Sequence, residues 1–348
     1  MRDDISAIPD YVPGKSEEDI KKKYGFERVV KLASNENPYG CSPRVLEALR
    51  GFAELNTYPP KDPEELRERI ADYAGFDPEM IFISAGLDGV LECAFKLLVE
   101  PGDEVCFALP TFPYYSILSK VYRAKENKTK RDEDFRMTDY SKKAKLTVVC
   151  SPNNPTGNVE SSGFVREIAE NVNGYVFIDE AYVEFAEKNL AELVDYENVI
   201  LGRTFSKAFG LANLRLGYAI MHPDMRKGFM KVNTPFPASS LAVKAGIAAL
   251  EDLEWMRKTV SMIKKNREWL FKKLKHVARP FRSEANFLYV ETEMGGKNVA
   301  EELEKRGVVV RALHGFEGAG RNAIRVTVGK EEENRVFVET LEEILCSQ

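Results

Sequence analysis

The chain has 348 residues, 44% of them hydrophobic and 30% charged, which is ordinary for a globular protein of one or two domains. Its formal net charge is -5, and both signs are interspersed, so no basic stripe suggests a nucleic acid or a membrane surface as a partner. We therefore expect small-molecule partners. No charged-then-apolar leader opens the chain and no apolar run approaches the ~20 residues of a membrane span, so we expect a soluble protein that is not secreted.

Short apolar runs alternate with helical patterns through the middle of the chain. This alternation predicts an α/β fold in which helices cover both faces of a mostly parallel sheet. The expected strands are Ile81–Ser84, Glu104–Ala108, Leu146–Cys150, Tyr175–Ile178, Val199–Gly202 and Gly217–Met221. Helices should fill the gaps between them, as Gly89–Val99 does between the first two strands.

The last third of the chain predicts a smaller α+β unit. Apolar residues recur at helical spacing over Asp252–Val277, which indicates a long amphipathic helix. Strands are then expected at Ala285–Glu291, Val308–Arg311 and Ala323–Val328, with helices at Asn298–Arg306 and Glu331–Ile344. We therefore expect a large domain, residues 38–238, and a small domain formed by residues 1–37 and 239–348.

Cysteine and histidine usage argues against several kinds of chemistry. The five cysteines are scattered and form no Cys-x-x-Cys pair, which fits a reducing cytoplasm. The three histidines show neither metal-ligand spacing nor a Gly-x-Ser-x-Gly partner motif. We therefore expect no metal site, no zinc-dependent hydrolysis and no catalytic triad.

The segment Tyr175–Tyr182 is apolar until it ends in two carboxylates, the first of which is Asp179. Ligands of a parallel sheet bind beyond the carboxyl ends of its strands, so Asp179 should face the binding crevice. It either caps the following turn or pairs with a cation. A protonated pyridine nitrogen is the sharper candidate, because an adjacent Asp keeps such a ring charged and able to accept electrons.

The segment Arg203–Gly217 follows the next predicted strand and combines hydroxyls, one lysine and one arginine with small residues. Taken alone, Lys207 would be an ordinary surface lysine. Its neighbours favour a ligand that carries both a phosphate and a carbonyl. Arg215 offers a bidentate fork for phosphate, and Thr204 and Ser206 offer hydroxyl donors.

Two further loops lie at strand ends. Ser151–Gly157 is a Pro/Gly turn in which Asn154 could donate to a phenolic oxygen of the same ring. Ser84–Gly89 lies between a strand and a helix, so its backbone amides predict an anion site. The chain contains neither a Gly-x-Gly-x-x-Gly nor a Gly-x-x-x-x-Gly-Lys-Ser/Thr motif, so the sequence predicts no loop that binds nucleotide phosphates.

In this order, these residues resemble the fold-type I pyridoxal-phosphate enzymes and, among them, the histidinol-phosphate aminotransferases. The resemblance runs almost end to end. Besides the segments around Asn154, Asp179 and Lys207, it rests on Tyr11–Lys15, Leu32–Gly40, Tyr58–Pro59, Pro110–Phe112 and Arg325–Gly329. It implies a large domain with a mostly parallel seven-stranded sheet flanked by helices, a smaller α+β domain, pyridoxal 5′-phosphate as the cofactor, and a homodimer with shared active sites.

The resemblance also implies roles for single residues. Lys207 would carry the cofactor as a Schiff base and later move the substrate's proton, and Asp179 would pair with the ring nitrogen. Tyr182 and Asn154 would contact the phenolic oxygen. The other expected cofactor contacts are Gly86, Leu87, Asp88, Phe112, Thr204, Ser206, Arg215 and, from the partner subunit, Tyr58. Phe112 would stack on the ring, although a core phenylalanine is the alternative.

Four residues match substrate-binding positions of these enzymes. Arg325 and Arg311 match arginines that hold the substrate's anionic groups, and Tyr11 and Asn35 match residues that close over the substrate. An exposed ion pair is the alternative for Arg325. One departure concerns the phosphate loop, where related sequences carry Gly-Ser/Ala-Asp-Glu and this chain has Gly86-Leu-Asp-Gly89.

The implied activity is transamination of L-histidinol phosphate with 2-oxoglutarate, which gives imidazole acetol phosphate and glutamate in histidine biosynthesis. Two arginines suit a pocket that must accept a phosphate ester and then a dicarboxylate. The alternatives are an aminotransferase for aromatic or other amino acids and a threonine-phosphate decarboxylase. Outside the enzymes, the alternative is a noncatalytic cofactor-binding regulatory module.

Overall fold

The computed structural model describes residues 3–6, 8, 10 and 14–346, so Tyr11 lies outside the described residues. The α-helices of this part of the chain are α1 (Asp3–Ser6), α2 (Glu17–Tyr24), α3 (Pro43–Leu49), α4 (Glu64–Ala74), α5 (Gly86–Leu98), α6 (Tyr114–Val121), α7 (Ser162–Asn171), α8 (Pro223–Val232), α9 (Ser240–Leu250), α10 (Leu253–Leu274), α11 (Gly296–Glu304) and α12 (Glu331–Cys346). None of them is long and apolar enough to cross a membrane.

The central sheet has seven strands within the described residues, in the order β2-β8-β7-β6-β5-β3-β4. They are β2 (Ile81–Ala85), β3 (Glu104–Leu109), β4 (Lys125–Lys130), β5 (Leu146–Cys150), β6 (Tyr175–Asp179), β7 (Val199–Thr204) and β8 (Leu216–Met221). Neighbours run parallel except where β8 pairs with β2 and β7. The predicted α/β fold with a mostly parallel, seven-stranded sheet is confirmed.

Both faces of this sheet are buried, because successive side chains of a strand point to opposite sides. In β6, Phe177 packs into the hydrophobic cluster that holds the apolar residues of α5 and α8. Its neighbour Ile178 packs into a second cluster with residues of α7, α9 and α10. The strands that are buried on both faces, such as β6, therefore consist of nearly continuous apolar residues, which is the pattern that predicted them.

The strand β4 was not predicted, since its sequence Lys-Glu-Asn-Lys-Thr-Lys carries no apolar residue. It pairs only with β3 and so forms an edge of the sheet. Charged side chains are common on edge strands because they discourage pairing with other chains. An apolar pattern cannot reveal a strand of this kind.

A smaller antiparallel sheet has the order β12-β13-β10-β9. Its strands are β9 (Arg279–Pro280), β10 (Phe287–Glu291), β12 (Arg311–Ala312) and β13 (Ala323–Thr327). A separate parallel pair joins β1 (Val30–Lys31) to β11 (Val308–Val309). The prediction of one strand over Val308–Arg311 was therefore wrong: the chain leaves one sheet and enters the other at Val310, whose burial continues the apolar run.

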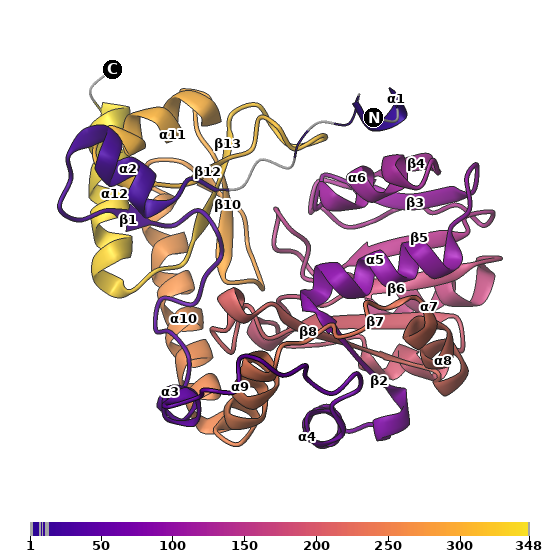
Figure 1. The fold of residues 1–348 in the computed structure, drawn as a ribbon. Helices are drawn as coiled ribbons and strands as arrows, with labels where there is room; N and C mark the ends of the chain where they lie inside the picture. Colours follow the sequence, from indigo (N-terminus) through magenta and orange to yellow (C-terminus); the bar gives the residue numbers. More distant parts are fainter. Residues whose placement is uncertain (1–2, 7, 9, 11–13, 347–348) are drawn as a thin grey trace.

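The two sheets lie on opposite sides of the molecule (Figure 1). The central sheet with α5 and α8 occupies one side, while the small sheet lies with α11, α12 and α2 on the other. The segment that contains β1 runs along the small sheet's side, far in sequence from its neighbours. The loops after β5, β6 and β7 consequently face residues of the N-terminal segment and of the small sheet.

The first turn of α5 packs tightly on the central sheet. The helix begins at Gly86, earlier than the predicted Gly89. Leu87 reaches over β7 at Gly202, where an added Cβ would collide with the Cδ1 atom of Leu87 and approach the ring of Phe177 to 3.0 Å. Gly202 thus makes room for the leucine that departs from the related sequences.

Candidate active site

A polar cavity of about 270 Å³ lies at the carboxyl ends of β5, β6 and β7. Parallel strands bring their carboxyl ends to one edge of the sheet, which places their loops together. The N-terminal segment and the small sheet close the opposite side. The predicted site residues that line the cavity are Asn35, Leu87, Asp88, Phe112, Asn154, Asp179, Tyr182, Thr204, Ser206, Lys207, Arg215, Arg311 and Arg325.

Asp179, the last residue of β6, presents a buried carboxylate to this cavity. Its Oδ2 accepts a hydrogen bond of 2.6 Å from the hydroxyl of Tyr115, and its Oδ1 accepts one of 3.0 Å from the backbone N–H of Ala181. Burial raises the pKa of Asp179 to about 6, and these two hydrogen bonds oppose the rise because they favour the charged form. The carboxylate therefore suits a cationic ligand atom.

Lys207 follows β7 and directs its amine into the same cavity. The amine donates to the carbonyl oxygen of Ser34 at 3.2 Å and lies 5.7 Å from the centre of the Tyr182 ring. Burial, aided by the positive charge of Arg325, lowers the pKa of Lys207 to about 8. Such an amine is partly neutral near pH 7.5, which a nucleophile or a general base requires.

Tyr182 is buried between the large and small sheets. Its hydroxyl accepts a hydrogen bond of 3.0 Å from the side-chain amide of Asn35, and its ring packs edge-on against Phe287 of β10. Burial raises the pKa of Tyr182 well above the usual value, so the phenol stays protonated. Asn35 is itself fixed by Thr327, whose hydroxyl accepts from the Asn35 backbone N–H at 2.9 Å.

Arg325 of β13 reaches across from the small sheet and is buried. Its guanidinium donates to Oδ1 of Asn154 at 2.5 Å and to the carbonyl oxygen of Ala33 at 2.8 Å. Arg325 therefore does not form the exposed ion pair that was its alternative interpretation. Because Oδ1 of Asn154 accepts this bond, the amide's NH₂ end is the one that can donate elsewhere.

The corner formed by the first turn of α5 and the loop before β8 gathers the residues predicted to hold phosphate. Gly86 has a φ of +76°, and a Cβ there would lie 2.9 Å from Nη2 of Arg215. That Nη2 atom pairs with Asp88 at 2.7 Å. The hydroxyl of Thr204 donates to that of Ser206 at 3.0 Å. Free N–H groups at a helix start, a guanidinium and two hydroxyls together suit a phosphate.

A larger cavity of about 580 Å³ adjoins the polar one and shares Gly14, Phe112, Arg311 and Phe316 with it. The guanidinium carbon of Arg311 lies 5.4 Å from the centre of the Phe316 ring. Arg311 thus stands where the two cavities meet.

Three predicted residues are not among the described residues that line the cavity: Gly86, which lies at the phosphate corner described above, Tyr11 and Tyr58. Tyr11 lies outside the described residues. Tyr58 is 81% exposed and stacks on Phe236, with ring centroids 4.5 Å apart. Pattern reasoning also missed Tyr115, because an aromatic residue next to a predicted core segment gives no polar signal, and its contact with Asp179 spans 64 positions.

Comparison with known proteins agrees with this arrangement. Residues 27–341 match the profile of the aminotransferase class I and II family. The chain is 49% identical over 322 residues to histidinol-phosphate aminotransferase 1 of Archaeoglobus fulgidus. This alignment covers 91% of this chain and 99% of that relative. It is 42% identical over 354 residues to the histidinol-phosphate aminotransferase of Methanosarcina mazei, which covers 98% and 96% of the two chains.

A solved structure is similar over the whole chain. The histidinol-phosphate aminotransferase of Sinorhizobium meliloti, determined in complex with pyridoxal-5′-phosphate, has a TM-score of 0.89 at 25% identity and covers 100% of this chain and 98% of its own.

Proposed function

This chain belongs to the class I and II aminotransferases and, within them, to the histidinol-phosphate aminotransferases; on that premise we propose that its polar cavity is the site of transamination. The substrates we propose are L-histidinol phosphate and 2-oxoglutarate, with imidazole acetol phosphate and glutamate as products, as part of histidine biosynthesis. The observation that carries the proposal is the partly buried Lys207 amine, with its pKa of about 8, in one cavity with Asp179, Tyr182 and Asn154.

The cavity fits pyridoxal 5′-phosphate as its cofactor. The two hydrogen-bond donors to Asp179 described above are neutral, so a protonated ring nitrogen would supply the missing positive charge. The phosphate would lie at the corner of Gly86, Thr204, Ser206 and Arg215, where the first N–H groups of α5 are available. Lys207 would hold the cofactor covalently, and Asn154 and Tyr182 would contact its phenolic oxygen. Phe112 would stack on the ring, with Leu87 and Asp88 beside the phosphate.

When bound, the cofactor supplies an electron-accepting ring that stabilises a carbanion at the substrate's α-carbon. The protein's own contribution is to hold and move protons. Lys207 would accept the proton of the α-carbon at its Nζ atom, since a pKa of about 8 leaves the amine partly neutral at physiological pH. Asp179 would keep the ring nitrogen charged, and its bonds to Tyr115 and Ala181 would keep the carboxylate anionic.

The substrate's anionic groups would be bound by Arg325 and Arg311. Arg325 is anchored by Ala33 and Asn154 and therefore presents a fixed guanidinium, whereas Arg311 lies at the junction of the two cavities. A phosphate ester and a dicarboxylate differ in length, which a pair of arginines at different depths accommodates. Asn35 and Tyr11 would complete the substrate side.

We extend the proposal to the assembly and the setting. Tyr58, exposed in its own subunit, would contact the cofactor phosphate of a second subunit in a homodimer. The cavity has one wall from residues 38–238 and another from residues 1–37 and 239–348, which supports that division into domains. The five cysteines are all free thiols, in keeping with a reducing cytoplasm.

The test is an assay of the purified protein with histidinol phosphate, phenylalanine and threonine phosphate as separate amino compounds. We expect glutamate to form from 2-oxoglutarate with histidinol phosphate as the preferred donor, and no carbon dioxide to be released. Lys207→Ala should abolish turnover and the absorbance of the lysine-bound cofactor. Preference for phenylalanine, or carbon dioxide from threonine phosphate, would contradict the substrate assignment. Failure of every donor to bleach the cofactor would point to a noncatalytic module.

A further inference from the structure

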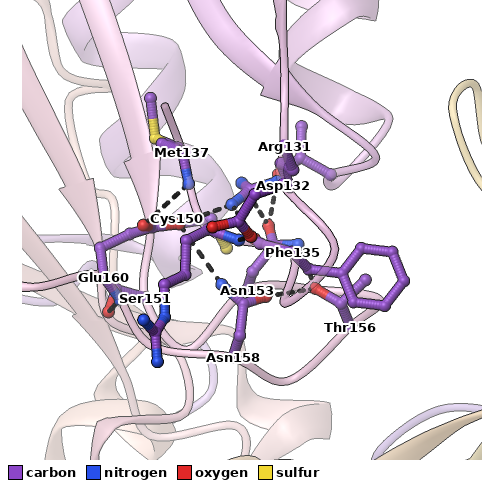
Figure 2. A network of polar contacts seen from close by, with 12 residues as sticks. Arg131, Asp132, Phe135, Met137, Cys150, Ser151, Asn153, Thr156, Asn158 and Glu160 are labelled. Atoms are coloured by element: carbon purple, nitrogen blue, oxygen red, sulfur yellow. Dashed lines mark hydrogen bonds and ion pairs between the residues drawn. The ribbon is translucent and has the colours of Figure 1, made fainter. Parts of the chain in front are cut away.

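A buried ion pair lies behind the polar cavity, outside the residues assigned above. Arg131 follows the edge strand β4, and Glu160 follows the loop after β5. Their side chains are 2% and 1% exposed, and Nη1 of Arg131 donates to Oε1 of Glu160 at 2.5 Å. Figure 2 shows this pair at the centre of a polar network.

The guanidinium of Arg131 connects two loops that reach the cavity. Its Nε donates to the carbonyl oxygen of Pro110 at 3.1 Å, and its Nη2 donates to Oδ1 of Asn153 at 3.0 Å. Asn153 in turn donates to the same Pro110 oxygen at 3.0 Å and accepts from the hydroxyl of Thr111 at 2.8 Å. One planar group thus holds the loop after β3 against the loop after β5.

Glu160 holds this arginine in place and is itself held. Its Oε2 accepts from the backbone N–H of Met137 at 3.0 Å, and its backbone N–H donates to the hydroxyl of Ser151 at 3.1 Å. Arg131 also donates from Nη1 to the carbonyl oxygen of Phe135 at 2.9 Å (Figure 2). The pair is therefore anchored to the backbone on both sides.

Each loop carries a residue of the proposed cofactor site next to the atoms that the network holds. Phe112 follows Thr111, and Asn154 follows Asn153. We propose that Arg131, fixed by Glu160, is a positioning residue of the aminotransferase: it sets the separation of the two loops and so places Phe112 and Asn154 against the cofactor. This inference rests on the function proposed above.

The energetics favour positioning over mere stabilisation. A buried ion pair costs much of its attraction in lost hydration, so replacing both charges together is often nearly neutral for stability. What a neutral pair cannot reproduce is the fork of Arg131, which holds several acceptors in fixed directions. A misplacement of about 1 Å at reacting groups can cost about a hundredfold in rate, so a small loop shift would be visible in catalysis.

The turn 131–137 also reaches the small sheet. The ring of Phe135 lies 5.0 Å from that of Phe281 and 5.1 Å from that of Tyr289, measured between centroids. Phe316, which lines both cavities, belongs to the same hydrophobic cluster. The loops that Arg131 holds are thus tied to the wall that carries Arg311.

The test uses the double variant Arg131→Met/Glu160→Gln, which leaves no buried charge unpaired, and the milder Arg131→Lys, which keeps the charge but loses the fork. The matched control is Arg166→Met/Glu192→Gln, which removes an exposed ion pair with a contact of 2.9 Å. Hydrogen exchange of the cofactor-free proteins is followed by mass spectrometry over residues 110–116 and 151–158. Cofactor affinity, steady-state rates and urea unfolding are measured on the same preparations.

We expect both loops to exchange at least about tenfold faster in the double variant than in wild type and in the control, while segments in β6 and β7 exchange as before. Cofactor affinity and kcat should fall about tenfold or more, beyond any change in the folded fraction. Arg131→Lys should show the same pattern more weakly, and it carries the test if the double variant does not fold.

Unchanged exchange in both loops would overturn the proposal, as would a rate loss that matches the loss of folded protein. Wild-type protein that does not react with histidinol phosphate would contradict the proposed function alone, because loop exchange is measured without cofactor or substrate.

Discussion

The hydroxyl of Tyr115 donates a 2.6 Å hydrogen bond to the carboxylate of Asp179, and both residues are buried. Tyr115 stands in the first turn of α6, whereas Asp179 ends β6. The contact therefore ties the helix after β3 to the residue that we propose pairs with the cofactor ring. It also opposes the effect of burial on that carboxyl's pKa.

Replacing Tyr115 by phenylalanine removes this donor and keeps the ring. The pKa of Asp179 should then rise above its present value of about 6, because the lost hydrogen bond favours the charged form. We expect the acid limb of the kcat/KM profile to move to higher pH and the rate at pH 7 to fall about tenfold, in line with a hydrogen bond to a charged group. The neighbouring Tyr114→Phe is the control; an acid limb that stays in place in Tyr115→Phe would contradict the assignment.

Lys207 should reduce the stability of the cofactor-free protein. Its pKa is lowered from 10.5 to about 8, so the folded state binds fewer protons than the unfolded state between these values. Lys207→Met should therefore raise the free energy of unfolding at pH 7, by about 1–3 kcal/mol. This gain in the free energy of unfolding of Lys207→Met over wild type should shrink as the pH rises through 8 and vanish above 10.5.

Urea unfolding of cofactor-free wild type and Lys207→Met at several pH values measures this difference. The exposed Lys188→Met is the control and should show no such trend. An advantage that grows with pH would refute the burial of the ammonium group.

Substitutions of Arg325 and Arg311, the two proposed substrate-binding arginines, should have different effects on the kinetics of the two substrates. Arg325 is buried and braced by Asn154, so Arg325→Lys should lower kcat/KM for both substrates by about a hundredfold, since lysine cannot reproduce the fork. Arg311→Met should affect histidinol phosphate more than 2-oxoglutarate, because only the phosphate ester needs to reach the junction of the cavities. Half-reactions followed by cofactor absorbance measure each substrate alone. Equal losses in Arg311→Met would contradict its assignment to phosphate.

Tyr58 gives a test of the shared site. If it acts on the partner's cofactor, a hybrid dimer of one Tyr58→Ala and one Lys207→Ala subunit contains one intact site, because the functional lysine then meets a functional tyrosine. Mixing the two inactive or weakened variants should restore activity, up to about half that of wild type per hybrid dimer. Each variant mixed with itself is the control. Absence of complementation in hybrids isolated by two affinity tags would place Tyr58 outside the partner's site.

The sequence predicts six of the seven strands of the central sheet, because these six are largely buried, apolar and bounded by loops. It also predicts the cavity, since polar residues such as Asp179 and Asn154 follow directly after strands whose carboxyl ends meet. Apolar strands and the polar residues that follow them can both be recognised from short stretches of sequence. A parallel sheet then brings these polar residues close together in space.

Contacts that depend on long-range packing were not predicted. The charged β4 lacks an apolar pattern, and Val308–Arg311 is divided between two sheets by partners far away in the chain. The sequence analysis assigned no role to Tyr115 or Arg131, whose partners Asp179 and Asn153 are brought to them only by the fold. The role of such a residue depends on the distant residue that it contacts in the fold, and its neighbours in sequence do not reveal that contact.

The packing of Leu87 against Gly202 links the phosphate corner to the sheet behind it. A Cβ at position 202 would collide with Cδ1 of Leu87 and lie 3.0 Å from the ring of Phe177, so a side chain there would have to displace one of them. Leu87 belongs to the first turn of α5, whose N–H groups face the proposed phosphate position. A substitution in the middle of the sheet could therefore weaken cofactor binding without touching any residue that contacts the cofactor.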